Sequence, residues 1–151
     1  MCDEKTLAYF DPSKKTRLYV DGSKKDGVGS ILAQYNDKVG KYQPVTYDSR
    51  ALKDAERRYS QIEVESLSIH AGVTKNHVYL YGLQESEIVT DHLPLVNLYN
   101  KYKQDMPPRV MHHKMMIQGY SSKVVYEKGA NNPSDYMSRH PNEAETRPDE
   151  K

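Results

Sequence analysis

Four acidic residues lie beside the most structured segments of this 151-residue chain: Asp21, Glu65, Asp91 and Asp135. Asp21 and Asp91 each close a short apolar run, Glu65 follows a helix-start pattern, and Asp135 follows a proline. Mg²⁺ prefers oxygen ligands, and proteins usually hold it with one or two carboxylates plus the phosphates of a substrate. Acids that converge from separate elements can therefore hold a pair of such ions, and the set predicts metal-dependent hydrolysis of phosphodiester bonds.

The elements that must position these acids are predicted from hydrophobic periodicity and from turn residues. Apolar, β-prone stretches predict strands over 17–21, 29–36, 41–47, 86–90 and 122–126, with a glycine-punctuated turn over 22–29. The first three strands follow one another closely, which predicts an antiparallel meander. Proline suits a first helical turn, so helices are predicted from Pro94 to about Tyr102, from Pro107 to about Gln118 and from Pro133, besides one from Ser60.

Two nearby glutamates compete for the role of metal ligand in the helix that starts at Ser60. Ser60 and Glu63 have the spacing of a capping box, in which both side chains satisfy free amide groups at a helix N-terminus. Glu65 lies two residues further on, about 200° around the helix axis, and therefore on a different face. The capping box gives Glu63 a structural role and favours Glu65 as the ligand.

Each remaining acid also has a structural interpretation. Asp21 precedes Gly22 and Ser23, where aspartate commonly forms a turn. Asp91 would suit the cap of the helix entered through Pro94. Asp135 would suit a first helical turn, where the helix dipole favours an acid. For each acid taken singly, the structural role and the metal-ligand role both stay open. Four acids placed at such positions by coincidence are less frequent than one shared metal site.

Longer stretches of the chain resemble the ribonuclease H domain in the reverse transcriptase polyprotein of gypsy-type long-terminal-repeat retrotransposons. The resemblance rests on their order and spacing over nearly the full length: Leu7–Pro12, Val20–Ser23, Gly27–Gln34, Pro44–Leu52, Ala55–Gln61 through Glu65, Tyr79–Gly82, Val89–Leu95, Val125–Gly129 and Ser138–Pro141. The separations of the four acids, 44, 26 and 44 residues, match the family pattern. The family also places its catalytic glutamate in the segment Glu65–Ile69.

The resemblance implies an α/β ribonuclease H-like fold, with a mixed five-stranded sheet and helices on both faces. We expect this domain over 1–141 and a disordered acidic tail over 142–151. The implied activity is hydrolysis of the RNA strand of RNA·DNA hybrids during reverse transcription, leaving 5′-phosphate and 3′-hydroxyl ends. Two Mg²⁺ ions, with Mn²⁺ able to substitute, would be held by the four acids and would bring an attacking water in line with the scissile phosphorus. Because clustered acids repel, at least one should have a raised pKa in the absence of metal.

Hybrid recognition would rest on 2′-hydroxyls and duplex shape, with no reading of the bases. Candidate contacts are the backbone amides of Gly22 and Ser23 and the side chains of Arg50, Gln61 and His92, although polar loop residues are usually only solvated. Cellular ribonucleases H carry a histidine in a loop before the last aspartate, and Lys128–Ser134 contains none. Tyr126 matches a tyrosine of gypsy-type domains and is a candidate substitute in catalysis; the alternative is a buried tyrosine at a strand end.

Composition limits the classes of protein that remain. A length of 151 residues with a mean hydropathy of −0.89 fits one domain with a modest, tyrosine-rich core. One cysteine excludes an intrachain disulfide framework and fits a reducing compartment. No apolar run approaches the length of a membrane span, so no membrane partner is predicted. His112 and His113 are adjacent and the other histidines lack ligand spacing, so no zinc site and no small-molecule cofactor are predicted.

The resemblance also implies partners and a location. We expect a polymerase domain upstream and an integrase downstream in a polyprotein, acting in the cytoplasm, in a virus-like particle or in the nucleus. The formal net charge of +1 is weak evidence against phosphate binding, because metal ions would add positive charge at the acids. Two other classes stay open: a catalytically inactive connection-type tether, and a host-recruited nucleic-acid-binding module of retroelement origin.

Overall fold

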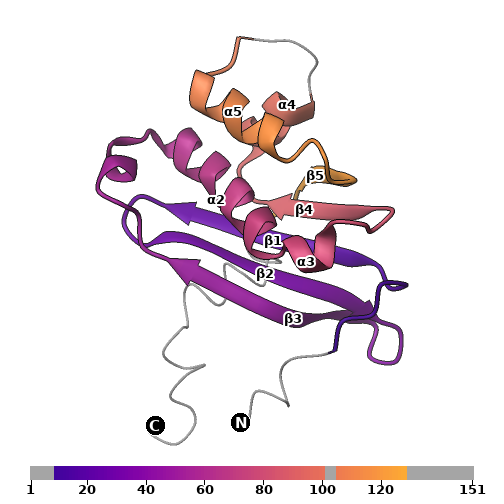
Figure 1. Ribbon diagram of the computed structural model, residues 1–151. Coiled ribbons are helices and arrows are strands. Elements are labelled where there is room, and N and C mark those ends of the chain that lie inside the picture. Colours follow the sequence, from indigo (N-terminus) through magenta and orange to yellow (C-terminus); the bar gives the residue numbers. More distant parts are fainter. Residues whose placement is uncertain (1–8, 101–104, 129–151) are drawn as a thin grey trace, which may run out of the picture.

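Five strands form one mixed sheet in the computed structural model, which describes residues 9–100 and 105–128 (Figure 1). The order across the sheet is β3-β2-β1-β4-β5. The first three strands pair antiparallel as the predicted meander, whereas β1 pairs parallel with β4 and β4 with β5. The bounds are Thr16–Ser23 for β1, Gly27–Asn36 for β2, Lys41–Arg50 for β3, Ser86–Thr90 for β4 and Ser122–Tyr126 for β5. The predicted mixed five-stranded sheet is confirmed.

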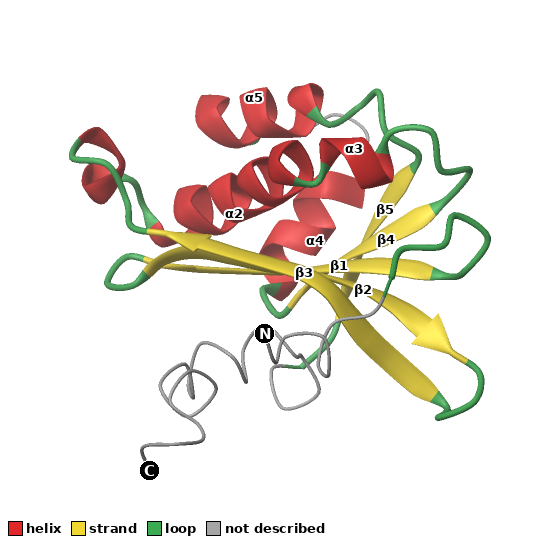
Figure 2. Cartoon of the chain, turned by 60° about the horizontal axis from the view of Figure 1, so that its bottom comes forward, coloured by secondary structure: helices red, strands yellow, loops and turns green. Residues whose placement is uncertain are grey.

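Three helices cover one face of this sheet (Figure 2). They are α2 (Gln61–Lys75), α4 (Leu93–Asn100) and α5 (Pro108–Met116), and two short helices, η1 (Ala55–Arg58) and α3 (His77–Leu80), complete the described set. Helix α2 packs against β1 and β2, while α4 packs against β5. Within residues 9–100 and 105–128 the buried cluster on the other face of the sheet comes from strands alone, so the helix expected on that face stays a prediction. The helix predicted from Pro133 lies outside the described residues, as does the tail over 142–151.

The two faces of β1 follow the alternation of its side chains. Leu18 and Val20 belong to the main core with Ile69 and Val73 of α2, and all four are fully buried. Tyr19, between them in sequence, joins a second buried cluster on the opposite face. Successive side chains of a strand point to opposite faces, and this alternation puts Gly22, like Leu18 and Val20, on the face that α2 covers.

Gly72 lies where α2 packs closely against the sheet. A Cβ on Gly72 would lie 3.1 Å from the Ser30 side chain, 3.2 Å from that of Val20 and 3.3 Å from that of Leu18. Glycine lowers intrinsic helix stability by about 1 kcal/mol relative to alanine. At this position the lack of a side chain allows α2 to pack closely against β1, which offsets the lower helix stability.

The structure corrects some of the predicted boundaries. Strand β1 continues through Ser23 and β2 begins at Gly27, so the turn is confined to residues 24–26 and does not span 22–29. Neither η1 nor α3 was predicted, and α5 ends at Met116, two residues before the expected end. The predicted end of α4 at Tyr102 lies outside the described residues. Within the part of the chain that the structure describes, no helix has the length and apolar character that a membrane crossing requires.

Candidate active site

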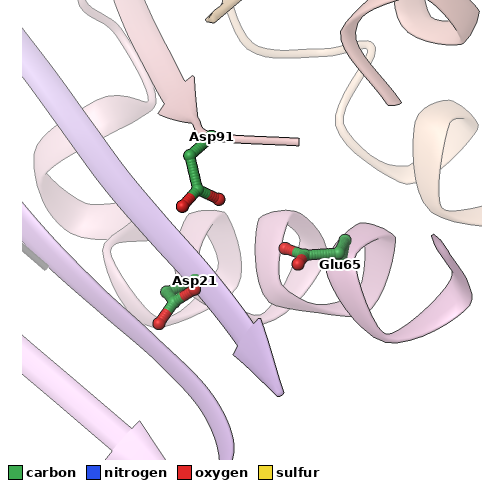
Figure 3. Close-up of side chains that lie close together, drawn as sticks. All are labelled: Asp21, Glu65 and Asp91. Carbon is green, nitrogen blue, oxygen red and sulfur yellow. The ribbon is translucent and has the colours of Figure 1, made fainter. Parts of the chain in front are cut away.

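Three of the four predicted acids meet at one end of the sheet (Figure 3). Asp21 comes from β1, Glu65 from the second turn of α2, and Asp91 from the residue that follows β4. Each offers a carboxylate oxygen, and these oxygens all lie within 4.8 Å of one another. Asp135 lies outside the described residues. Within residues 9–100 and 105–128, no other group of three or more histidine, cysteine or acidic side chains has its ligand atoms this close together.

The pairing of β1 with β4 explains why the two aspartates meet. These strands are parallel neighbours, and Tyr19 is paired with Val89. Asp21 and Asp91 each come two residues later, so both lie at the same edge of the sheet. Asp21 is inside β1, and the turn that follows is held by Ser23, whose Oγ accepts hydrogen bonds of 3.1 Å from the backbone amides of Lys25 and Asp26. The interpretation of Asp21 as a turn residue is therefore wrong.

Gly22 allows α2 to bring Glu65 to this edge. A Cβ on Gly22 would lie only 2.8 Å from the backbone oxygen of Val64, the residue before Glu65. Real Cβ atoms essentially never approach a backbone oxygen so closely, so any other residue at 22 would push α2 away. Glycine at this position thus permits the contact between the strand end and the helix turn that carries the third carboxylate.

Burial and like charge act together on Glu65. Its side chain is 5% exposed. Loss of solvation, with repulsion from Asp21 and Asp91, raises its pKa to about 8, against an opposing hydrogen bond from Gln61. The predicted raised pKa in the acid group is confirmed. Oε1 of Glu65 is buried without a hydrogen-bond partner in the described part of the chain. A buried carboxylate oxygen of this kind is suited to a cation, because a positive ion offsets both the desolvation and the repulsion.

Glu63 has the structural role predicted for it. Its carboxylate accepts a hydrogen bond of 2.8 Å from the backbone amide of Ser60, and the Ser60 side chain accepts one from the Glu63 amide, which completes the capping box. Arg109 lies 3.5 Å from the same carboxylate. The Ser60 amide, with help from Arg109, lowers the pKa of Glu63. The two glutamates are therefore separated as the sequence predicts, with Glu63 at the cap and Glu65 among the acids.

The segment after β4 is fixed by backbone hydrogen bonds that leave Asp91 beside the other acids. Helix α4 begins at Leu93, and the carbonyl of His92 accepts hydrogen bonds from the amides of Leu95 and Val96. The residue next to the helix is therefore His92, and Asp91 is one position too early to be its N-cap. The amide of His92 donates to Thr90 Oγ1 at 3.2 Å. Burial lowers the pKa of the His92 imidazole.

The other predicted contacts have defined structural partners. Gln61 donates to the Gly22 carbonyl at 3.2 Å and to Oε2 of Glu65 at 2.9 Å. Arg50 forms a two-pronged ion pair with Glu56, at 2.8 and 3.1 Å. The role of Gly22, Ser23, Arg50, Gln61 and His92 in nucleic-acid binding stays a prediction.

Tyr126 lies at the end of β5, opposite Thr90 and hence next in the sheet to the strand end that carries Asp91. Its side chain is 42% exposed, so the interpretation as a buried tyrosine is wrong. A catalytic role for Tyr126 stays a prediction.

Sequence reasoning missed one polar network in the core. The Ser66 hydroxyl lies 2.8 Å from the Tyr99 hydroxyl and 2.9 Å from Nδ1 of His113, and all three residues are buried. Ser66 directly follows Glu65, so the network supports the turn of α2 that carries the carboxylate. No local signal could have revealed it, because the three residues come from three helices.

Fold and site together place this chain in the class of ribonuclease H-like domains. The prototype foamy virus protease-reverse transcriptase superposes with a TM-score of 0.61 at 18% identity, over 82% of this chain and 16% of that chain. RNase H1 from Halobacterium salinarum superposes with a TM-score of 0.59 at 13% identity, over 82% of this chain and 93% of that one. At these identities the likeness establishes the fold.

Residues 11–120 match the family model described as the RNase H-like domain found in reverse transcriptase, and the chain belongs to that family. The retrovirus-related Pol polyproteins of the Drosophila melanogaster transposons opus and gypsy are 30% and 33% identical to it, over 93% and 88% of this chain. The resemblance to gypsy-type elements is thereby confirmed. The chain spans 14% and 12% of the length of these two relatives.

Proposed function

We propose that the chain is a ribonuclease H that cuts the RNA strand of RNA·DNA hybrids during reverse transcription of a retroelement. The observation that carries this proposal is the convergence of carboxylate oxygens from Asp21, Glu65 and Asp91 within 4.8 Å. Three acids at this distance repel one another, and a folded chain keeps such an arrangement most readily where cations offset it. Asp135, from beyond the described residues, is proposed as the fourth ligand.

The proposed ligands fit Mg²⁺ because all of them are carboxylates, the hard oxygen donors that this ion prefers, and Mn²⁺ accepts the same donors. A bound pair of ions would supply stabilisation for the charge on the attacking and leaving oxygens of the phosphodiester. The chain's own contribution is positional. The end of β1, the end of β4 and the second turn of α2 fix the carboxylates, and Gln61 holds Oε2 of Glu65 by a hydrogen bond of 2.9 Å.

The substrate would lie across the edge where β1 and β4 end. The Gln61 side chain bridges the Gly22 carbonyl and Glu65. Gln61 is therefore the residue best placed to contact the sugar-phosphate backbone of the hybrid beside the acids. Tyr126, exposed at the end of β5, is proposed to contribute its hydroxyl to the reaction or to product release. Proposed partners are a polymerase domain upstream and an integrase downstream in one polyprotein, acting in the cytoplasm, in a virus-like particle or in the nucleus.

A cleavage assay tests the proposal directly. A hybrid labelled separately on its RNA and DNA strands is incubated with the chain in Mg²⁺, in Mn²⁺ or in chelator. We expect cuts in the RNA strand only, dependent on the metal, with little sequence preference. Cleavage should weaken steeply as salt rises, because phosphate contacts release counterions on binding. Binding of the hybrid without cleavage in either metal would favour the inactive tether or binding module.

A further inference from the structure

Three histidine rings from two helices gather beside a pocket that the proposed hydrolysis does not use. His70 lies on α2, and His112 and His113 lie on α5. The ring centres are 5.3 Å apart for His70 and His113, 5.9 Å for His112 and His113, and 6.1 Å for His70 and His112. All three line a pocket of about 900 Å³ between β2, β3, α2 and α5. The separation of His70 from the other two along the chain conceals this cluster from sequence inspection.

The ring separations are close to those of a three-histidine metal site. Three imidazoles on one tetrahedral ion, with Zn–N bonds of about 2.0 Å, hold their ring centres about 5 Å apart. The ring planes are inclined by 82° between His70 and His112 and by 45° between His70 and His113, and the ring nitrogens do not all lie within 4.8 Å of one another, so the rings must turn to share an ion. His70 is half-buried and His112 is exposed, so both rings can turn about χ2, a torsion with broad preferences, without disturbing the core.

His113 is already held in place by its other ring nitrogen. Its Nδ1 lies 2.9 Å from Ser66 Oγ, and Ser66 is fixed in turn by Tyr99 at 2.8 Å. Metal-binding histidines almost always anchor the second nitrogen in this way, which orients the ring and leaves Nε2 for the ion. The side chain is 4% exposed. Burial, reinforced by His70 and His112, lowers the pKa of His113 to about 4, so the ring is neutral at pH 7, as a ligand must be.

We propose that His70, His112 and His113 bind one transition-metal ion of the zinc class, with water from the pocket in the fourth position. Imidazole suits Zn²⁺, Ni²⁺ and Cu²⁺, whereas the carboxylates of Asp21, Glu65 and Asp91 suit Mg²⁺, so the two sites differ in chemistry. The ion would join α5 to α2. Ser66 is a positioning residue for His113 and also follows Glu65, so the new site and the acid group share one turn of α2.

Titration of the full chain with Co²⁺ and Zn²⁺, in a large excess of Mg²⁺ that saturates the acids, tests this site. We expect one ion per chain and Co²⁺ absorption bands typical of nitrogen ligands. His70→Gln and His112→Gln should each weaken binding more than about tenfold, and Ser66→Ala about tenfold, the usual effect of losing an orienting partner. Asp91→Asn should leave the affinity unchanged, and so should the matched control His77→Gln, which changes an α3 histidine that does not line the pocket.

Four outcomes would refute the proposed histidine site: no binding of Co²⁺ or Zn²⁺, a thiolate band that places the ion at Cys2, loss of binding in Asp91→Asn, or equal affinity in His70→Gln and wild type. The readout is independent of cleavage. A chain that fails to cut hybrid but binds Co²⁺ through the histidines would refute the proposed function and leave the metal site intact.

Discussion

The side-chain amide of Gln61 joins the end of β1 to the carboxylate of Glu65. Its Nε2 donates to Oε2 of Glu65 at 2.9 Å, one helical turn along α2, and to the Gly22 carbonyl at 3.2 Å. The amide therefore fixes one oxygen of Glu65, while Oε1 lies buried without a partner among the described residues. With one oxygen held by Gln61, the other is oriented for an ion that the acids would share.

Substitutions can test which of the two glutamates is the metal ligand and which one caps the helix. Glu65→Gln should lower hybrid cleavage by orders of magnitude with little loss of stability, because it removes a ligand and relieves a buried charge. Glu63→Ala should leave the rate largely unchanged and lower the free energy of unfolding by about 0.5 to 2 kcal/mol, the scale of a helix-cap defect. Cleavage rates and urea unfolding of both variants measure the two effects. Reversed phenotypes would move the catalytic role to Glu63.

The metal-free protein should lose stability as pH rises, through Glu65. Its pKa is about 8 in the fold and near 4.5 in an unfolded chain, so the folded state binds more protons between these values. Stability falls with pH wherever the folded state binds more protons, here on the order of a few kcal/mol across that window. Urea unfolding in chelator at about pH 5 and about pH 8 measures the decline for wild type and Glu65→Gln. An equal decline in the variant would show that Glu65 is not its source.

Gly22→Ala should displace α2 from the acids. The added Cβ would lie 2.8 Å from the Val64 carbonyl, which is backbone and can move only with the helix. We expect a loss of about 1 to 3 kcal/mol in unfolding free energy and a marked fall in cleavage rate. Gly29→Ala is the matched control, since its Cβ would lie 3.5 Å from the Asp48 oxygen in ordinary contact. If both variants keep wild-type rate and stability, the close approach at Gly22 is not needed.

Tyr126→Phe distinguishes a catalytic role of the Tyr126 hydroxyl from a role as a surface side chain only. The ring is 42% exposed, so removal of the hydroxyl should leave stability unchanged. If the hydroxyl assists proton transfer, the cleavage rate should fall by about 10² or more. Single-turnover rates and thermal unfolding of the variant provide both measurements. An unchanged cleavage rate would show that the Tyr126 hydroxyl has no catalytic role.

Local patterns were sufficient for the elements that carry the site. The capping box at Ser60, the strand that ends near Asp21 and the strand before Asp91 each have a local signal, and the structure confirms these three elements. The sequence could also separate Glu63 from Glu65, because their roles depend on positions within one helix.

Features that depend on packing between distant segments could not be predicted. The glycine at 22 suggested a turn, yet it is a strand residue whose missing side chain admits α2. Glycine inside a helix usually weakens it, yet the missing side chain of Gly72 lets α2 pack closely against Val20. The histidines showed no ligand spacing along the chain, because His70 meets His113 only through the contact of α2 with α5.

Cleavage of hybrid by Asp91→Asn in Mg²⁺ tests whether Asp21, Glu65 and Asp91 form one catalytic metal site. The substitution keeps the size of the side chain and removes one negative charge from the group. We expect wild type to cut the RNA strand and spare double-stranded DNA, while Asp91→Asn loses cleavage by orders of magnitude and retains its fold by circular dichroism. Near wild-type cleavage by a folded Asp91→Asn variant would show that Asp91 is not a ligand of the catalytic metal.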